Sequence, residues 1–157
     1  MAATPPAFAV RRAVEFHETD QAGIVHFSNI FLWMESAELT FLRENNIPVI
    51  SVQAGGERGW PRASACAQFK SPLRFGDEIE TRLWVLSVGG ACVRYGFEIW
   101  RVAGSGPVEL AATGELASVH ASRARATGAL RPQPLTQGIR AKLLKLVAPD
   151  PAKSAKT

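Results

Sequence analysis

The segment that most constrains the fold begins at Ser28 and ends near Asn45, and it reads as one long helix. Its apolar residues, among them Trp33 and Met34, do not form a single stripe but surround most of the predicted helix. A helix that is apolar on all sides must be buried by other parts of the chain. Ser28 is the predicted N-cap, and Pro48 follows the predicted C-terminal end. The rest of the chain must therefore form a surface that covers this helix.

Segments with the alternation of apolar and polar residues typical of strands lie on both sides of this helix. The pair Gly89-Gly90 between two of them indicates a hairpin, whereas the glycine-rich segment 51–61 is predicted to be a loop. Strands joined by short turns form an antiparallel sheet, whose apolar face needs a cover. We predict an α+β fold in which an antiparallel sheet curls around one long central helix. The predicted strands are 8–17, 62–70, 78–88, 91–102 and 108–121.

The length of 157 residues predicts a single domain over residues 1–157. Its core is expected over about residues 8–135, followed by a short amphipathic helix within 135–147. The lysine-, alanine- and proline-rich tail 149–157 is predicted to be disordered. An exposed sheet edge in such a fold favours a dimer.

Composition limits the class of function. No apolar segment is long enough to span a membrane and no signal-like N-terminus is present, which predicts a cytoplasmic protein. The two cysteines, Cys66 and Cys92, are expected to be small buried side chains without a disulfide. The net charge of +4, without a basic stripe, disfavours nucleic acid and suits a small anionic ligand. No histidines or acids have ligand spacing, so no metal site is predicted.

The junction between the first strand and the long helix carries the candidate chemistry. Asp20 and Gly23 lie in this junction, immediately before the helix start. A helix start offers unpaired N–H groups and a partial positive charge, and a carboxylate can act as nucleophile or general base. Together these are sufficient to hydrolyse a thioester. The alternative for Asp20 is a turn residue that binds its own backbone.

The residues of this junction resemble a known family. The resemblance is carried by residues 14–25, then by Phe27, Asn29, Trp33 and Glu35, and by a second segment over residues 72–79. In these segments the chain is similar to the hotdog-fold acyl-CoA thioesterases, of the 4-hydroxybenzoyl-CoA thioesterase and Tol–Pal-associated types. The resemblance covers about residues 8–135 and implies the same fold. It also implies a homodimer or homotetramer with the active site at the subunit interface.

The resemblance implies that Asp20 is the catalytic carboxylate and that the backbone N–H of Phe27 holds the thioester carbonyl oxygen. The Tol–Pal-associated type has a histidine at the position of Phe27, so that role is not transferred to His26, which stays a lesser candidate. Glu35 could orient water or Asp20, or join a buried polar network. The basic loop that binds nucleotide phosphates in the benzoyl type is replaced here by residues 87–91.

Further residues are candidates for binding substrate. The four arginines among them lie in predicted loops or strand ends and could contact phosphates, although a solvated surface is the ordinary alternative. His17 and His120 are expected to be structural. The substrate-binding candidates are Gly23, Ile24, Val25, Asn29, Trp60 and Arg62, and the phosphate candidates are Arg58, Arg62, Arg123 and Arg125.

We therefore expect an acyl-CoA thioester hydrolase, with an acyl group that could be aromatic and with no cofactor, since coenzyme A is part of the substrate. One alternative is a non-catalytic hotdog module that binds acyl-CoA or acyl-carrier protein, and a hotdog dehydratase is a third. Assays with acyl-CoAs and with an enoyl-CoA distinguish the three. The sequence leaves open the acyl group, the choice between nucleophile and base for Asp20, and the choice between dimer and tetramer.

Overall fold

The computed structural model describes residues 4–53, 56–104 and 106–148, so the predicted disordered tail 149–157 lies outside the described residues. Nine strands, two α-helices and one short 3₁₀-helix make up this part of the chain. In chain order they are β1 (Phe8–Ala13), η1 (Phe16–Glu18), α1 (Ser28–Glu44), β2 (Ser51–Gln53), β3 (Gly56–Gly59), β4 (Arg62–Phe69), β5 (Glu78–Val88), β6 (Cys92–Ala103), β7 (Gly106–Val119), β8 (Ala121–Ala124), β9 (Leu130–Pro132) and α2 (Gln137–Leu144).

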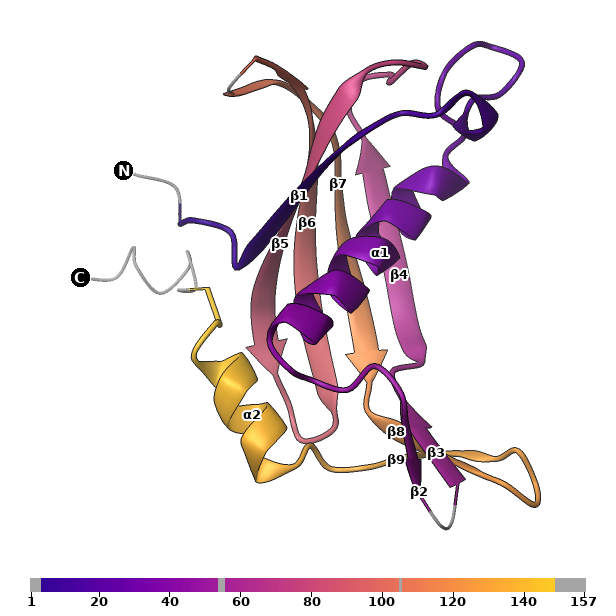
Figure 1. Ribbon diagram of the computed structural model, residues 1–157, viewed down its shortest axis with the longest axis vertical. Helices are drawn as coiled ribbons and strands as arrows, with labels where there is room; N and C mark the ends of the chain where they lie inside the picture. The colour runs from indigo at the N-terminus through magenta and orange to yellow at the C-terminus, as the bar shows by residue number, and fades with distance from the viewer. Residues whose placement is uncertain (1–3, 54–55, 105, 149–157) are drawn as a thin grey trace.

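Five strands form one antiparallel sheet in the order β1-β5-β6-β7-β4, and α1 lies diagonally across one of its faces (Figure 1). The predicted combination of an antiparallel sheet with a helix is confirmed. A second antiparallel sheet of four short strands, β2-β3-β8-β9, lies at the end of the molecule near the C-terminus of α1 (Figure 1). Helix α2 follows this small sheet and confirms the predicted short second helix.

Two local predictions are wrong. The first strand ends at Ala13 rather than at residue 17, because the chain turns into η1 directly after it. The segment 51–61 is not a loop, since it contains the β2–β3 hairpin. Strand β3 is held by β8, with Arg58 opposite Ser122, and a pairing over that sequence separation leaves no local signal.

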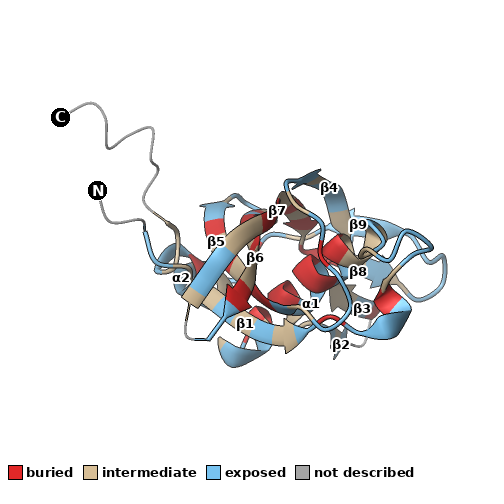
Figure 2. Cartoon of the chain, turned by 90° about the horizontal axis from the view of Figure 1, so that it is seen from above, coloured by how far each residue is buried: buried red, intermediate tan, exposed pale blue. Residues whose placement is uncertain are grey.

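Helix α1 is buried along one stripe and not on all sides. The stripe faces the sheet and contains Ile30, Trp33, Met34, Ala37, Glu38, Phe41 and Leu42. Figure 2 shows the buried residues gathered between α1 and the sheet. On the opposite side Leu32 is 57% exposed, so the prediction of a fully enclosed helix is wrong for the single chain. The cover that the apolar pattern of α1 predicts is therefore supplied on one side only within the single chain.

A glycine in β7 allows the helix to lie close to the sheet. A Cβ atom on Gly114 would lie only 2.6 Å from the Met34 sulfur and 2.9 Å from the Cys66 carbonyl oxygen. Any side chain at this position would therefore have to displace the end of the Met34 side chain and the backbone of β4 at Cys66. Gly114 thus leaves room for the Met34 side chain between α1 and the sheet.

Strand β4 forms one edge of the five-stranded sheet, and most of its residues are exposed. Cys66 lies on this edge and is exposed, and Cys92 is partly exposed, so the predicted burial of the cysteines is wrong. Both thiols are free. Among residues 4–53, 56–104 and 106–148, neither helix has the length and apolarity needed to cross a membrane.

Candidate active site

The loop between η1 and α1 is closed by short-range hydrogen bonds around Asp20. The Asp20 backbone N–H donates to the Ile24 carbonyl oxygen at 2.9 Å, and the Gly23 N–H donates to the Asp20 carbonyl oxygen at 3.0 Å. Gly23 has a φ of 71°, a left-handed conformation that favours glycine. The Asp20 carboxylate accepts the Ala22 N–H through Oδ1 at 2.8 Å, while Oδ2 has no partner among the described residues. One oxygen thus orients the carboxylate and the other is available.

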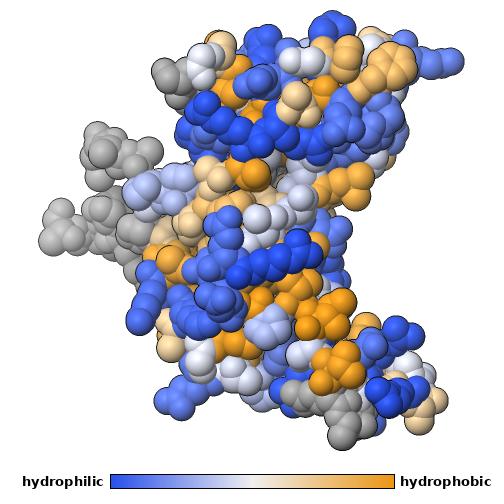
Figure 3. All heavy atoms as spheres, in the orientation of Figure 1, coloured by the Kyte–Doolittle hydropathy of each residue, from blue (hydrophilic) through white to orange (hydrophobic). Residues whose placement is uncertain are grey.

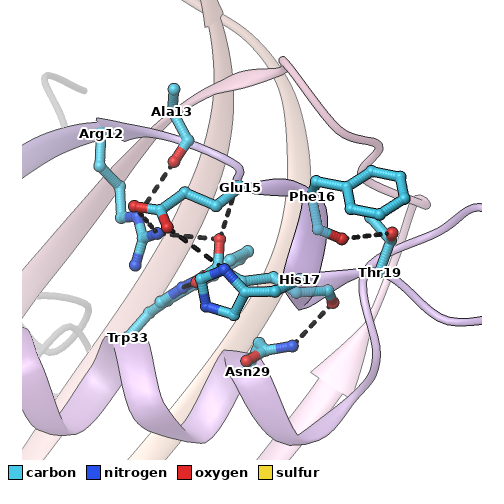
Figure 4. Close-up of polar contacts among 9 residues, drawn as sticks. Arg12, Ala13, Glu15, Phe16, His17, Thr19, Asn29 and Trp33 are labelled. Atoms are coloured by element: carbon cyan, nitrogen blue, oxygen red, sulfur yellow. Dashed lines mark hydrogen bonds and ion pairs between the residues drawn. The ribbon is translucent and has the colours of Figure 1, made fainter.

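The buried side chain of Glu18 holds the start of this loop in place. It is only 4% exposed, and its carboxylate accepts hydrogen bonds from the Trp33 indole N–H, the Arg12 guanidinium and the Glu15 backbone N–H, each at 2.8 Å. Figure 4 shows the partners Arg12, Glu15 and Trp33, which come from β1, from the turn between β1 and η1, and from α1. Arg12 also lies over the Trp33 ring, at 5.4 Å from its centroid. A buried carboxylate with three donors is fully satisfied and holds these segments in one arrangement.

The backbone of Glu18 fixes the start of α1 as well. Its carbonyl oxygen accepts the His26 N–H at 2.9 Å and the Asn29 side-chain amide at 2.8 Å. Sequence reasoning missed Glu18, although an acid at the end of η1, three residues after Glu15, fits the pattern of a capping box. It placed Asn29 in a substrate-binding role, whereas here the Asn29 amide holds the loop.

The first turn of α1 has no side-chain cap. The N-cap is Phe27 rather than the predicted Ser28, whose hydroxyl instead lies 2.8 Å from His26 Nδ1. The backbone N–H groups of His26, Ser28, Asn29 and Ile30 all have acceptors. Within the described residues the Phe27 N–H has none. An unpaired N–H at a helix start is a ready donor for a developing negative charge.

Asp20 and Phe27 border the same pocket, which has a volume of about 370 Å³. Its walls are mostly apolar, with Ile24 and Val25 on the loop side and the end of β4 on the other. Sequence reasoning missed Lys70 and Ser71 in this second wall, because contacts between distant segments place them there: both backbone N–H groups donate to the Ala111 carbonyl oxygen of β7. The lining residues are Asp20, Ile24, Val25, Phe27, Ile30, Phe69, Lys70, Ser71, Pro72, Leu73 and Ala111.

Other predicted site residues lie elsewhere. His26 is exposed, its ring stands 4.6 Å from that of Phe27, and it does not line the pocket of Asp20. Glu35, Trp60 and Arg62 line a second pocket of about 350 Å³, farther along α1. Of the phosphate candidates, Arg58, Arg62 and Arg123 also border this second pocket. In a single chain the predicted residues therefore form two groups and not one.

A charged cluster around Glu38 adjoins the second pocket, which Arg62 and Glu35 line. The Glu38 carboxylate is fully buried, accepts the Ser118 hydroxyl at 2.8 Å and forms an ion pair with Arg62 at 2.8 Å. Arg62 also pairs with the half-exposed Glu35 at 3.2 Å. Burial raises the pKa of Glu38 more than the Arg62 charge and the Ser118 hydrogen bond lower it. Burial, with the nearby Glu38 charge, also raises the pKa of the Tyr95 hydroxyl.

Metal ligation finds no support in the described part of the chain. No group of three or more histidine, cysteine, aspartate or glutamate side chains there could hold a metal ion. The Asp20 pocket combines one carboxylate, one helix start and a mostly apolar wall. Such a pocket can bind an apolar acyl group, hold its carbonyl oxygen at the helix start and place a carboxylate beside the carbonyl carbon.

The sequence of this site identifies its family. A family model described as the thioesterase-like superfamily matches residues 14–143. The chain belongs to this superfamily, which confirms the resemblance carried by the junction around Asp20. The matched region contains Glu18, Asp20, Phe27 and every strand of the five-stranded sheet except β1, which ends at Ala13.

The chain is also similar to individual proteins whose names describe CoA-thioester hydrolases. The chain is 30% identical over 99 residues to a 1,4-dihydroxy-2-naphthoyl-CoA hydrolase of Synechococcus sp. (strain CC9902), a match that covers 60% of this chain and 66% of the relative. The chain spans less than two thirds of the length of each of the five curated relatives it matches, from 53% to 66%.

Solved structures show the same hotdog fold. A 1,4-dihydroxy-2-naphthoyl-CoA thioesterase from Synechocystis superposes with a TM-score of 0.73 at 21% identity, covering 90% of this chain and 98% of that one. A 4-hydroxybenzoyl-CoA thioesterase mutant in complex with 4-hydroxybenzoyl-CoA gives 0.71 at 18% identity, with coverages of 90% and 98%. At these identities the likeness establishes the fold alone.

Proposed function

We propose that this protein is an acyl-CoA thioester hydrolase whose active site is the pocket of Asp20. The observation that carries the proposal is that a carboxylate with one free oxygen and an unpaired helix-start N–H border the same apolar pocket. Names of related proteins refer to the hydrolysis of CoA thioesters. Because the named acyl groups are aromatic, an aromatic acyl-CoA is the substrate class we would test first.

In the proposed reaction the acyl group enters the apolar pocket and its carbonyl oxygen accepts the Phe27 N–H. The free oxygen of Asp20 then either attacks the carbonyl carbon, giving an anhydride that water hydrolyses, or takes a proton from the water that attacks. In both routes the thiolate of coenzyme A leaves, takes up a proton, and the acid is released. No cofactor is needed, since coenzyme A is part of the substrate. Gly23 supports the turn, and His26 has no contact that assigns it a step.

We also propose a homodimer, or a homotetramer built from it, in which β4 pairs with β4 of a second copy. Three features support this assembly: β4 is an exposed sheet edge, Leu32 is exposed on α1, and apolar side chains gather near the C-terminal end of α1 in Figure 3. In this proposed assembly, the second copy covers the side of α1 that the single chain leaves exposed.

An antiparallel β4 pair would join the two groups of candidate residues. Arg62 begins β4 and Phe69 ends it. Two antiparallel copies place the start of one strand beside the end of the other. Because Phe69 lines the Asp20 pocket and Arg62 lines the second pocket, the second pocket of one copy would face the Asp20 pocket of its partner. Trp60, Glu35 and the arginines could then contact the coenzyme A portion of a substrate bound by the other copy.

Further proposals concern the whole chain. A single domain is supported by one continuous core cluster that includes residues from α1, the five-stranded sheet and α2. A cytoplasmic location is supported by the free thiols of Cys66 and Cys92, because exposed unpaired cysteines are typical of reducing compartments.

The substitution Asp20→Asn tests the proposed activity. Asparagine can still accept the Ala22 N–H, so the turn should persist while the negative charge is removed. We expect kcat on benzoyl-CoA and 4-hydroxybenzoyl-CoA to fall by roughly 10²–10⁴-fold with an unchanged melting temperature. Asp77→Asn is a control, since Asp77 also accepts a turn N–H, from Arg74 at 2.8 Å, but does not line the pocket.

The proposal fails if neither wild type nor control cleaves any member of an aliphatic and aromatic acyl-CoA panel, or if Asp20→Asn keeps the full rate. Tight binding of CoA esters without turnover would instead identify a non-catalytic binding module. Hydration of an enoyl-CoA, followed at its absorbance band, would identify a dehydratase.

A further inference from the structure

A pocket at the end of the molecule opposite the Asp20 loop lies outside the proposed active site, although it shares Arg58 and Trp60 with the second pocket. It has a volume of about 360 Å³, within the range of small-molecule sites. It lies between the small sheet and the start of α2. Both of these elements are at the same end of the molecule as the C-terminus of α1 (Figure 1). The lining residues are Pro48, Ser51, Arg58, Gly59, Trp60, His120, Thr136, Gly138, Ile139 and Lys142.

The charge of this pocket is entirely positive. Arg58 and Lys142 line it, and none of the lining residues is acidic. Within the described residues neither cation forms an ion pair; Lys142 donates instead to the Asn46 carbonyl oxygen at 2.9 Å. Arg58 is half-buried and Lys142 is exposed, and both can donate charge-assisted hydrogen bonds to an anion bound between them. The site therefore suits a ligand with a negative charge.

A buried histidine supplies a second polar group. His120 is only 4% exposed, and its Nδ1 lies 3.1 Å from the Gln133 carbonyl oxygen. A carbonyl can only accept, so Nδ1 carries the proton and Nε2 is an acceptor in the neutral ring. Within the described residues Nε2 has no partner. A ligand hydroxyl could donate to it.

The remaining walls are apolar or aromatic. The Trp60 ring is 7% exposed and its centroid stands 5.1 Å from that of His120, while its N–H is satisfied by the Pro48 carbonyl oxygen at 2.9 Å. Ile139 continues the apolar wall on α2. At the start of α2 the Ile139 N–H is capped by the Thr136 hydroxyl at 3.3 Å, so this helix start adds only part of its N–H groups to the site. An inorganic ion alone would leave the aromatic wall unused.

We propose that this pocket binds a ring-sized organic acid that carries a hydroxyl group. Its carboxylate contacts Arg58 and Lys142, its ring lies against Trp60 and Ile139, and its hydroxyl donates to His120 Nε2. The site does not depend on the proposed hydrolysis, although an acid released by that reaction would belong to the same chemical class. If both proposals hold, the end pocket is a second site for such an acid, separate from the Asp20 pocket.

Calorimetric titration of the full chain with 4-hydroxybenzoate, benzoate and 4-hydroxybenzamide tests this proposal. We expect 4-hydroxybenzoate to bind most tightly, benzoate more weakly, and the neutral amide at least about tenfold more weakly than the acid. Lys142→Gln should weaken 4-hydroxybenzoate binding about tenfold. We choose Lys142 rather than Arg58 for this test because Arg58 also borders the neighbouring pocket. Lys145→Gln, an exposed lysine outside the pocket, should leave the affinity unchanged.

The Asp20→Asn variant separates this site from the proposed active site. Unchanged 4-hydroxybenzoate affinity in Asp20→Asn, together with a loss in Lys142→Gln, supports the end pocket even if no thioester is hydrolysed. Equal affinity for acid and amide, or equal binding by wild type and Lys142→Gln, would overturn the proposal. Loss of binding in Asp20→Asn alone would place the acid in the other pocket.

Discussion

Removing the buried carboxylate of Glu18 should destabilise the protein and misplace the loop that carries Asp20. The substitution Glu18→Ala leaves the Trp33 indole N–H without an acceptor in a residue that is 3% exposed, and it leaves the Arg12 guanidinium without its closest partner. Breaking a buried ion pair by removing one partner typically costs about 3–5 kcal/mol. The Arg12 side chain is 34% exposed, so water can replace part of its lost interaction and the lower end of that range applies.

We therefore expect a loss of about 3 kcal/mol in the free energy of unfolding, which corresponds to a fall of about 6–12 °C in melting temperature for a chain of this length. Thermal unfolding followed by circular dichroism measures it. Glu15→Ala is the matched control: Glu15 lies three residues away in the same turn, but its side chain is 62% exposed. Its loss should cost no more than about 0.5 kcal/mol, and its backbone N–H remains in place.

Glu18 lines no part of the Asp20 pocket, so it is a positioning residue. Measured well below the melting temperature, Glu18→Ala should lower kcat much more than it raises KM, because an error of about 1 Å in a reacting group can cost about 10²-fold. A melting temperature within about 2 °C of wild type, with an unchanged kcat, would refute the argument that Glu18 holds the loop.

Two further predictions concern α1. Because burial raises the pKa of Glu38 above its ordinary value of 4.5, the fold favours the protonated carboxyl, and wild type should lose stability as pH rises from 4.5 through the raised pKa. Glu38→Gln should therefore gain stability relative to wild type over that interval in urea unfolding, and a relative loss would contradict the sign. In the proposed dimer, mixing unfolded Asp20→Asn and Glu35→Gln chains and refolding them should restore about a quarter of wild-type activity. If both variants are impaired and the mixture recovers no activity, Asp20 and Glu35 of one active site come from the same subunit. If Glu35→Gln alone is fully active, Glu35 is not part of the active site.

The sequence predicted the elements whose signals are local. The strands β5, β6 and β7 alternate over many residues, and Ile79, Leu83 and Val85 of β5 are fully buried as that alternation requires. The β2–β3 hairpin was missed because its short strands are stabilised by β8, far along the chain. The all-round apolar pattern of α1 does not say whether the cover comes from the same chain, and here Leu32 remains exposed.

The residues of the candidate site also differ in how far the sequence alone could indicate them. Turn chemistry and a helix start are local features, so Asp20 and Gly23 could be named as candidates from the residues, whereas Phe27 was named only through the family resemblance. For Glu18 the capping-box spacing is a local signal of the turn, but its contact with Trp33, fifteen positions away and on another element, is not. Burial turned an ordinary-looking acid into the anchor of the loop, and burial is a property of the assembled fold.

The two interpretations of Asp20 from sequence, a turn residue and a catalytic acid, describe the same geometry. The bond from the Ala22 N–H to Oδ1 is the contact that a turn aspartate makes. That bond also restrains the carboxylate and leaves Oδ2 free, and in the proposed reaction the unpaired Phe27 N–H on the same pocket binds the carbonyl oxygen. A catalytic group is held to its productive geometry by bonds that are not themselves catalytic. The turn bond is thus a reason to expect an ordered carboxylate at this site. Asp20→Asn removes the charge of the side chain but keeps the turn, so it separates the role of Asp20 in holding the loop from its proposed role in catalysis.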